Sequence, residues 1–493
     1  FEAAGFKNAI IAKDPPSKEE DPDWSPEDIR YSVVRYLASP TLNANGPHVS
    51  DPRSGEIIES DINWYHNVMK LLRNWYFIQT SAVDPDARNT EFKDELMGEL
   101  IRFVSAHEVG HTIGLPHNMG SSSAFPVDSL RSATFTKKYG TAPSVMDYAR
   151  FNYVAQPEDE GVVLMPSHWD SPNVGIYDKF SVMWGYKPIL DVTEEEEKDI
   201  LKKWIIEKED DLMYRFGPSG GIDPSSQTED LGDNAIKASK YGIKNLKRII
   251  PNLIEWTTKD GENYDELEYM YSQVLNQFRR YMGHVTTNIG GVYQYYKTSD
   301  QDGAVYTHVN KRHQKSCLIF LNQNLFETPY WMINKEILNK IEYAGTTERI
   351  RSLQSGYLNR ILDFGRMARM IENEALNGSS AYSIGEMMDD LKDGIWSELN
   401  KGKNIDIYRR NLQRSYITRL AFIMKNDQPS RPGWEDYITS VKVDVSDIRS
   451  ISMGSLIELK KDLKKAIKKY SDKSTKSHLN YCISMIDETL KGV

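Results

Sequence analysis

The chain has 493 residues and a mass of 56.6 kDa, and its 39% hydrophobic and 11% aromatic content excludes a mainly disordered protein. The formal net charge is −10, and residues 1–190, with 26 acidic against 17 basic residues, carry −9 of it. No apolar run approaches the ~18 residues of a membrane span, and basic residues concentrate only within 460–476, so we expect neither a membrane span nor nucleic-acid binding.

Residues 1–190 mix strand and helix patterns. Alternating apolar and polar residues predict strands at 10–12 and 29–37, and a Pro-Gly turn at 51–55 followed by a strand at 56–62 predicts a hairpin. From Glu91 the apolar residues recur every three to four positions, which predicts a helix that ends at Gly114 and Pro116. This segment therefore reads as a mixed α+β domain.

Beyond residue 190 helical patterns dominate. Thr193 and Glu196 form a capping-box pattern that opens the first of them. Helices are expected at 193–215, 233–258, 262–282, 346–374, 384–400, 405–425 and 452–491, with a hairpin at 292–296 and 304–308. The lysines of 460–476 alternate with apolar residues and are expected on the solvated face of a helix. We therefore predict two domains, an α+β domain over 1–190 and a mainly helical domain over 191–493.

The strongest chemical signal lies on the helix that starts at Glu91. His107 and His111 are four positions apart, about 40° around a helix, so both imidazoles can face one metal ion. Glu108 lies beside them, where a carboxylate can take a proton from a metal-bound water. Gly114 allows the chain to bend back and bring His117 as a third ligand. Three histidines leave a fourth position open, which is typical of a catalytic zinc site.

A second signal follows in the segment from Ser144 to Tyr148, which contains Met146. A long histidine motif followed by such a methionine turn is typical of metzincins. The sequences HEVGHTIGLPHN, SVMDYARFNYVAQP and GIYDKFSVMWGY occur here in that order, and the chain thereby resembles the metzincin zinc endopeptidases, most closely the large bacterial Met-zincins. Asn118 departs from the Asp, Glu, Ser or Pro that follows the third histidine in better-known branches.

The resemblance implies a metzincin fold, with a twisted mixed sheet and an active-site helix, and a role for each matching residue. It implies zinc on His107, His111 and His117, Glu108 as general base and Met146 as an apolar floor beneath the ligands. Tyr148 resembles the tyrosine that some metzincins place beside the zinc, where it could donate to the oxyanion. The implied activity is hydrolysis of a polypeptide, bound extended along an edge strand within 47–62.

Two alternatives stay open at this point. A zinc-containing binding or scaffold protein would keep the site without turnover, although it would need only the histidines and not Glu108. A zinc hydrolase acting on non-peptide amides would use the same residues. The other seven histidines lack ligand spacing and are expected at the surface or in the core, at positions 48, 66, 168, 284, 308, 313 and 478.

The resemblance also carries expectations about the precursor. A metzincin sheet has a first strand ahead of the segment that resembles residues 1–10, so we expect the natural polypeptide to continue upstream of Phe1 with that strand and an export signal. The expected location is therefore outside the cytoplasm. No cysteine lies in 1–190, so a cysteine-based latency switch cannot operate from within this region.

Overall fold

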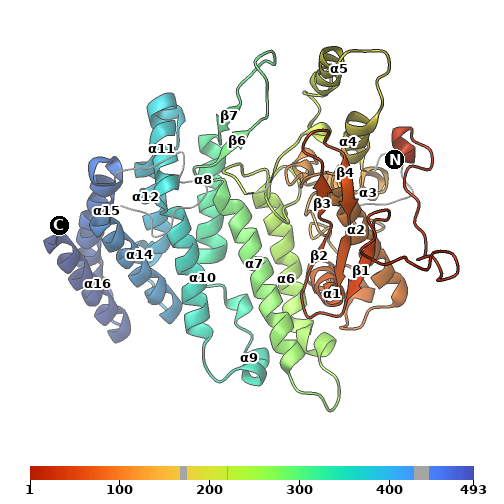
Figure 1. Ribbon diagram of the computed structural model, residues 1–493. Helices are drawn as coiled ribbons and strands as arrows, with labels where there is room; N and C mark the ends of the chain where they lie inside the picture. The colour runs from red at the N-terminus through yellow and green to blue at the C-terminus, as the bar shows by residue number, and fades with distance from the viewer. Residues whose placement is uncertain (167–174, 219, 427–442, 493) are drawn as a thin grey trace. The chain divides into compact units, whose positions relative to one another are not determined.

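The computed structural model describes residues 1–166, 175–218, 220–426 and 443–492. Its contacts divide the chain into two compact units, the first made of Phe1–Gly220, Ser225–Val274 and Tyr296–Gly303, the second of Gly221–Pro224, Leu275–Tyr295 and Ala304–Val493. The chain is an α+β protein in which helices outweigh strands (Figure 1). The domain boundary expected near residue 190 stays a prediction; the first unit itself continues past it through α6 (Ala235–Thr257).

The first unit contains two small sheets. Their strands are β1 (Val34–Leu37), β2 (Ala44–Asn45), β3 (His48–Ser50), β4 (Ile57–Ser60) and β5 (Ile62–Tyr65). One sheet has the order β1-β5-β2, in which β1 runs parallel and β2 antiparallel to β5. The other is the antiparallel hairpin β3-β4, which confirms the hairpin predicted around the turn at 51–55.

Helices cover one side of the first sheet and form the core with it (Figure 1). The helices of this unit before α6 are α1 (Val68–Thr80), α2 (Asp94–Thr112), α3 (Ala133–Tyr139), α4 (Ile176–Tyr186) and α5 (Glu194–Ile206). In α1, Val68, Leu72 and Tyr76 recur every four positions and are buried. They pack with Leu100 of α2 and Trp64 of β5 in one apolar cluster. This cluster holds α2 in place, and α2 carries the histidine motif.

Two strand predictions in the first unit were wrong in whole or in part. Residues 10–12 form no strand, and Ile10 and Ile11 are 54% and 63% exposed. The strand expected over 29–37 begins only at Val34, because Asp28 starts a turn in which it accepts the backbone N–H of Tyr31 at 3.0 Å. Three helices of this unit were not predicted, namely α1, α3 and α4.

β1 lies at the edge of its sheet among the described residues. Its side chains Val34 and Tyr36 are 66% and 59% exposed.

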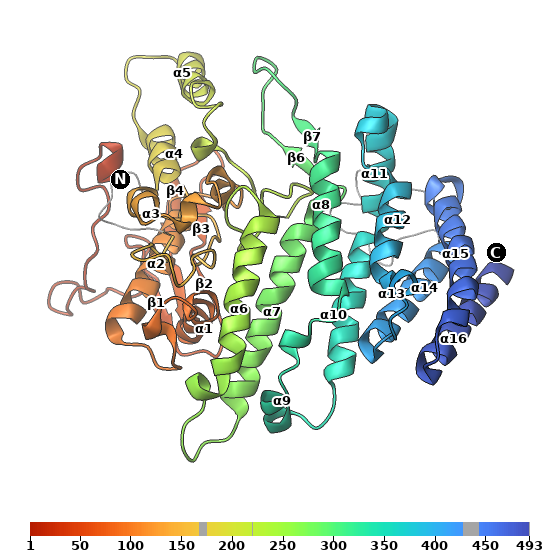
Figure 2. The same cartoon turned by 180° about the vertical axis from the view of Figure 1, so that it is seen from behind.

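The second unit consists mainly of helices (Figure 2). α7 (Asp265–Thr287) leads into it from the first unit, and the hairpin of β6 (Val292–Gln294) and β7 (Tyr306–His308) follows as predicted. The remaining helices are α8 (Lys311–Leu321), α9 (Lys335–Ile341), α10 (Thr346–Ile361), α11 (Phe364–Asn377), α12 (Ile384–Ile395), α13 (Ser397–Lys401), α14 (Ile407–Lys425), α15 (Asp447–Ala466) and α16 (Lys473–Lys491).

Three helices expected in this unit are each broken in two, and the one expected at 384–400 is divided into α12 and α13. Asp363 caps α11 by accepting the backbone N–H of Arg366 at 3.1 Å, so the pattern at 346–374 splits into α10 and α11. Asp472 caps α16 by accepting the N–H of Thr475 at 2.7 Å, so 452–491 splits into α15 and α16. In the first unit the capping box at Thr193 is confirmed, although its helix ends at Ile206.

The lysine-rich segment follows the predicted amphipathic pattern. Leu459, Leu463 and Ala466 are buried, whereas Lys461 and Lys464 are exposed. Among the helices that the structure describes, none combines the length and the apolar character needed to cross a membrane.

Candidate metal centre and active site

Three imidazoles converge at the C-terminal end of α2. His107 and His111 lie on the same stripe of the helix, and their ring centroids are 4.7 Å apart. Gly114 has φ +83°, a left-handed conformation that glycine adopts without strain, and it turns the chain out of the helix. The turn brings the ring of His117 to 4.6 Å from that of His111 and 5.3 Å from that of His107.

Backbone carbonyls fix the orientation of two of these rings. Nδ1 of His107 lies 2.7 Å from the carbonyl oxygen of Val145, and Nδ1 of His111 lies 2.9 Å from that of Leu115. Because a carbonyl only accepts, each Nδ1 must carry the proton, which leaves the lone pair on Nε2. Nε2 of His111 is 3.1 Å from Nε2 of His117, and Nε2 of His107 is buried without a hydrogen-bond partner among the described residues.

The nitrogens of these three histidines fit a metal ion. Ligand nitrogens of the three histidines all lie within 4.8 Å of one another, and no other such group occurs in the part of the chain that the structure describes. A tetrahedral zinc with bonds of about 2.0–2.1 Å separates its nitrogens by roughly 3.3 Å, close to the His111–His117 spacing. Burial lowers the pKa of His107 to about 3 and that of His117 to about 4, and it also lowers the pKa of His111. The imidazoles are therefore neutral, as metal ligands must be.

Met146 packs under the histidine motif. Its side chain is 1% exposed, and a Cβ at Gly110 would stand only 2.2 Å from its sulfur. No other residue fits at position 110 unless the methionine moves. The backbone carbonyl of Met146 also accepts the N–H of Asn118 at 3.0 Å, which ties the methionine turn to the residue after His117.

Asn118 and Asp147 hold the loop that follows the third histidine. The side-chain amide of Asn118 donates to the carbonyl of Arg215 at 2.9 Å, and its oxygen accepts the N–H of Gly217 at 2.8 Å. The carboxylate of Asp147 accepts the N–H of Ser122 at 2.7 Å, and burial raises its pKa to about 7. The unusual asparagine thus anchors a neighbouring segment of the first unit.

Asp178 of α4 supports the histidines through hydrogen bonds to the methionine turn. Its carboxylate accepts the hydroxyl of Ser144 at 2.6 Å and the N–H of Val145 at 2.7 Å, and burial raises its pKa to about 6. The carbonyl of the same Val145 receives Nδ1 of His107. A chain of hydrogen bonds therefore runs from α4 through the methionine turn to the first histidine.

Replacing Asp178 should weaken metal binding without removing a ligand. We expect Asp178→Ala to bind zinc about 10–100-fold less tightly than the wild type, because outer partners of metal ligands contribute on this scale. Competition with a chromophoric chelator measures the affinity. Asp199→Ala, an exposed aspartate of α5, is the control and should bind zinc like the wild type. Equal affinity in the wild type and Asp178→Ala would contradict this link.

Glu108 is the carboxylate next to the three ligands. It is 5% exposed, and burial raises its pKa to about 7, opposed by a hydrogen bond from the backbone N–H of Gly46. Gly46 follows β2 and lies directly against α2, since a Cβ there would stand 2.5 Å from the backbone oxygen of Glu108. The absence of a side chain at position 46 is thus what allows this segment to approach the helix.

Tyr148 lies beside two of the histidines. Its ring centroid is 5.0 Å from that of His107 and 4.6 Å from that of His117, and burial raises the pKa of its phenol. The guanidinium of Arg150 lies 4.4 Å from the centre of the Tyr148 ring and 3.3 Å from the centre of the Trp75 ring. The cation is therefore held between two aromatic faces, one of which belongs to the candidate site.

A contact with Glu229 holds Arg150 in place. Its Nε lies 3.3 Å from the carboxylate of Glu229, which is fully buried, and the N–H of Glu229 donates to the carbonyl of Tyr148 at 2.9 Å. Both Arg150 and Glu229 adopt left-handed backbone conformations, with φ of 56° and 64°. Such conformations are uncommon outside glycine. Their presence on two paired residues indicates that the surrounding contacts hold this segment in its shape.

The structure brings together all seven residues expected at the site. Sequence reasoning missed five others, namely Gly46, Gly110, Trp75, Arg150 and Glu229, together with Asp178 in a motif that had been recognised without a role. Gly110, between two motif histidines, and Arg150, two positions after Tyr148, lie within recognised motifs, whereas Gly46, Trp75 and Glu229 gave no signal in the sequence. Of the remaining histidines, His48 touches the motif, with Nδ1 3.0 Å from the carbonyl of His111. His168 lies outside the described residues.

Comparison with known proteins supports the same assignment. A family model described as Met-zincin matches residues 89–403, about two thirds of the chain, and spans the histidines, the methionine turn and Asp178. No curated protein and no solved structure matches the chain. The family is one of zinc metalloproteases, which agrees with three histidines that could hold a metal ion. The chain therefore belongs to the Met-zincin family.

Proposed function

We propose that this protein is a zinc-dependent endopeptidase in which Glu108 is the general base. The observation that carries the proposal is a buried glutamate that follows His107 on α2, where three imidazoles bring their ligand nitrogens within 4.8 Å of one another. A site that only held metal would not need a carboxylate at this position. Family membership supports the same reaction class.

Each residue of the site has its own role in the proposed hydrolysis. Zinc, when bound by the three histidines, supplies a Lewis acid and lowers the pKa of a coordinated water. Glu108 takes the proton of the attacking water and returns it to the leaving amine. Tyr148 can donate a hydrogen bond to the negative oxygen that develops on the substrate carbonyl.

We propose that an extended substrate pairs with the segment 47–62. All residues of β3 are exposed, and Gly46 and His48 on either side of Pro47 contact α2 at Glu108 and His111. A peptide added to this strand would thus run past the histidines. A Val49→Pro variant with an unchanged KM would contradict this placement, because proline removes a strand N–H.

Cleavage of a mixed peptide library, with and without a chelator, tests the function. Chelator-sensitive cleavage of internal peptide bonds would support the proposal. Zinc binding without cleavage would favour a scaffold protein, and turnover of non-peptide amides alone would favour the other hydrolase. A catalytic part over 1–190 and a location outside the cytoplasm belong to the same proposal on the strength of the resemblance, and cell fractionation tests the location.

Tyr148→Phe should lower kcat/KM less than removal of the general base Glu108 does. The variant loses one donor to the developing oxyanion, so we expect kcat/KM to fall about 10-fold, the scale of one hydrogen bond of ~1.4 kcal/mol. Steady-state kinetics on a peptide from the library measures the effect, with zinc content as the control. A larger loss than that of Glu108→Ala would mean that the two roles are reversed.

Arg150 is proposed to position Tyr148. Arg150→Gln should lower kcat several-fold in the wild type and have no further effect in Tyr148→Phe, because its influence passes through the phenol hydroxyl. A merely structural role would instead give the same additional loss in both backgrounds. Arg102→Gln, which removes an exposed arginine of α2 paired with Glu99, serves as the control and should leave kcat unchanged.

A further inference from the structure

The last two helices of the second unit, α15 and α16, carry a strong excess of positive charge. Residues 461–476 hold seven lysines and two aspartates, a net charge of +5 in a chain whose formal net charge is −10. The two helices lie side by side (Figure 1), and only residues 470–472 separate the short turn Ile467–Lys469 after α15 from the start of α16. All seven lysines are exposed and together form what we call the lysine patch: Lys461, Lys464, Lys465, Lys468, Lys469, Lys473 and Lys476.

None of these seven lysines forms an ion pair among the described residues. The carboxylates beside them are bonded to other lysines. Glu458 accepts the ammonium of Lys392 at 2.9 Å, and Asp487 of α16 pairs with Lys460. Asp462 is exposed on the same stretch of α15 and offsets only one of the charges. The lysine patch therefore keeps most of its positive charge without a bonded anion.

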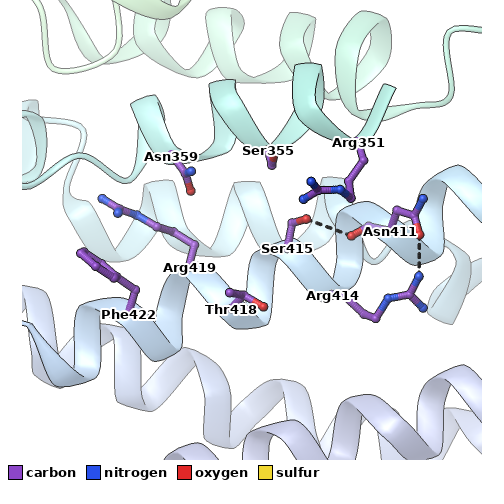
Figure 3. Close-up of a pocket in the computed structure, with 9 residues that line it drawn as sticks. All are labelled: Arg351, Ser355, Asn359, Asn411, Arg414, Ser415, Thr418, Arg419 and Phe422. Atoms are coloured by element: carbon purple, nitrogen blue, oxygen red, sulfur yellow. Dashed lines mark hydrogen bonds between the residues drawn. The ribbon is translucent and has the colours of Figure 1, made fainter. Parts of the chain in front are cut away.

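Three arginines of the same unit show the contrast. They line a cavity of about 570 Å³ between α10 and α14 (Figure 3). Arg351 pairs with a glutamate of its own helix, Arg414 donates to the side-chain oxygen of Asn411, and Arg419 donates to the carbonyl of Leu362. These basic groups have partners within the fold, whereas the lysines of the patch have none there.

Some positions in the lysine patch also act against the helices that carry them. Lys473 and Lys476 lie in the first turn of α16, which contains no acidic residue beyond its cap Asp472. The partial positive charge of a helix N-terminus disfavours cations there. Lys461 and Lys465 lie four positions apart on α15, where like charges repel. A bound anionic partner would offset both effects.

The exposed face of α15 adds apolar side chains to these charges. At about 100° per residue, Met453, Ile457, Lys461, Lys464 and Lys465 fall within an arc of about 120°. Met453 and Ile457 are 39% and 36% exposed, whereas the buried leucines of α15 occupy the opposite side of the helix. A helix face that combines lysines with exposed apolar side chains is typical of helices that bind at a membrane surface.

We propose that the lysine patch docks the protein onto the surface of an anionic lipid bilayer. The lysines bind the headgroups as flexible point charges, and Met453 and Ile457 enter the boundary between headgroups and acyl chains. Nucleic acid suits the patch less well. Residues 461–476 contain no arginine, and their one aromatic residue, Tyr470, is buried, so the guanidinium and stacking contacts of nucleic-acid readers are missing. This docking is peripheral and does not depend on the proposed peptidase activity.

Co-sedimentation of the full chain with lipid vesicles tests the proposal. One set of vesicles contains phosphatidylcholine alone, and the other an equimolar mixture with phosphatidylglycerol. We expect saturable binding to the anionic vesicles only, and a steep loss of binding as salt is added, because salt screens the charge of the headgroups. Binding to neither set, or equal binding to both, would contradict the proposal.

Substitution of the lysines locates the contact. A variant that combines Lys464→Gln, Lys465→Gln and Lys468→Gln should bind the anionic vesicles at least ~10-fold more weakly, because each lysine near such a surface adds to the attraction. The matched control replaces three exposed lysines of another helix, α6, by glutamine, namely Lys240, Lys244 and Lys247. The control should bind like the wild type. An equal loss in both variants would show that net charge rather than the lysine patch governs binding, and the proposal would be wrong.

Ile457→Ser separates a lipid surface from a soluble polyanion. The variant loses an apolar contact but no charge, so its binding to anionic vesicles should weaken several-fold, while any binding to a duplex DNA oligonucleotide should stay the same. Thermal unfolding checks that the variant is folded, and Met453→Ser takes its place if it is not. Tighter binding to the DNA than to the vesicles, or vesicle binding unchanged in the folded variant, would assign the lysines to another polyanion and overturn the proposal.

Discussion

Glu108→Ala should keep its zinc and lose peptide hydrolysis by at least ~10²-fold, the usual scale of general acid-base participation. The three converging nitrogens come from His107, His111 and His117, so the metal loses no ligand when the glutamate is removed. The attacking water, however, loses the group that accepts its proton. Zinc content by elemental analysis and kcat/KM on the same preparation separate these two effects.

Glu108→Gln sharpens the test. A glutamine keeps the size of the buried side chain and can still accept the N–H of Gly46, yet it cannot take a proton. Glu95→Gln, an exposed residue of the first turn of α2, is the control and should retain wild-type activity. Wild-type cleavage by Glu108→Gln would refute the mechanism, and loss of zinc from it would make Glu108 a ligand.

The site was predictable from sequence wherever its geometry is local. The spacing of His107, Glu108 and His111 follows from the pitch of one helix, and Gly114 marks the turn that delivers His117. Gly46 and Asp178 could not be found in this way, because each reaches the motif from more than 60 positions away along the chain, through the packing of separate elements. The Arg150 and Glu229 pair is similarly distant in sequence, and its left-handed conformations leave no pattern in a sequence without glycine at those positions.

For the fold, too, local patterns in the sequence predicted some elements and not others. Apolar periodicity revealed most helices of the second unit, but it passed over the breaks at Asp363 and Asp472, where the apolar pattern resumes almost in phase after the cap. At residues 10–12 the error was the opposite one, because a strand was predicted where none forms. Isoleucines favour strands, yet a strand needs a neighbour for its backbone groups, and none is present there among the described residues.

His111→Ala should abolish stoichiometric zinc binding. We expect one zinc per wild-type chain, bound by the nitrogens of residues 107, 111 and 117 at about 2.0–2.1 Å. Removing one of three protein ligands should weaken binding by more than the ~10–100-fold typical of an outer partner. His111 is the ligand to replace, because it is only half-buried, whereas His107 is 4% exposed and its truncation would leave a cavity in the core.

The matched control is His48→Ala. His48 lies next to the same turn, with Nδ1 3.0 Å from the carbonyl of His111, but its ring is not among the converging three. It should therefore keep one zinc per chain, while His111→Ala loses it and loses hydrolysis with it. If His48→Ala lost as much zinc as His111→Ala, the shape of the turn rather than the imidazole nitrogen would govern binding, and the ligand assignment would be wrong. Unchanged zinc uptake by His111→Ala would be equally decisive, because two histidines cannot make a site of this kind on their own.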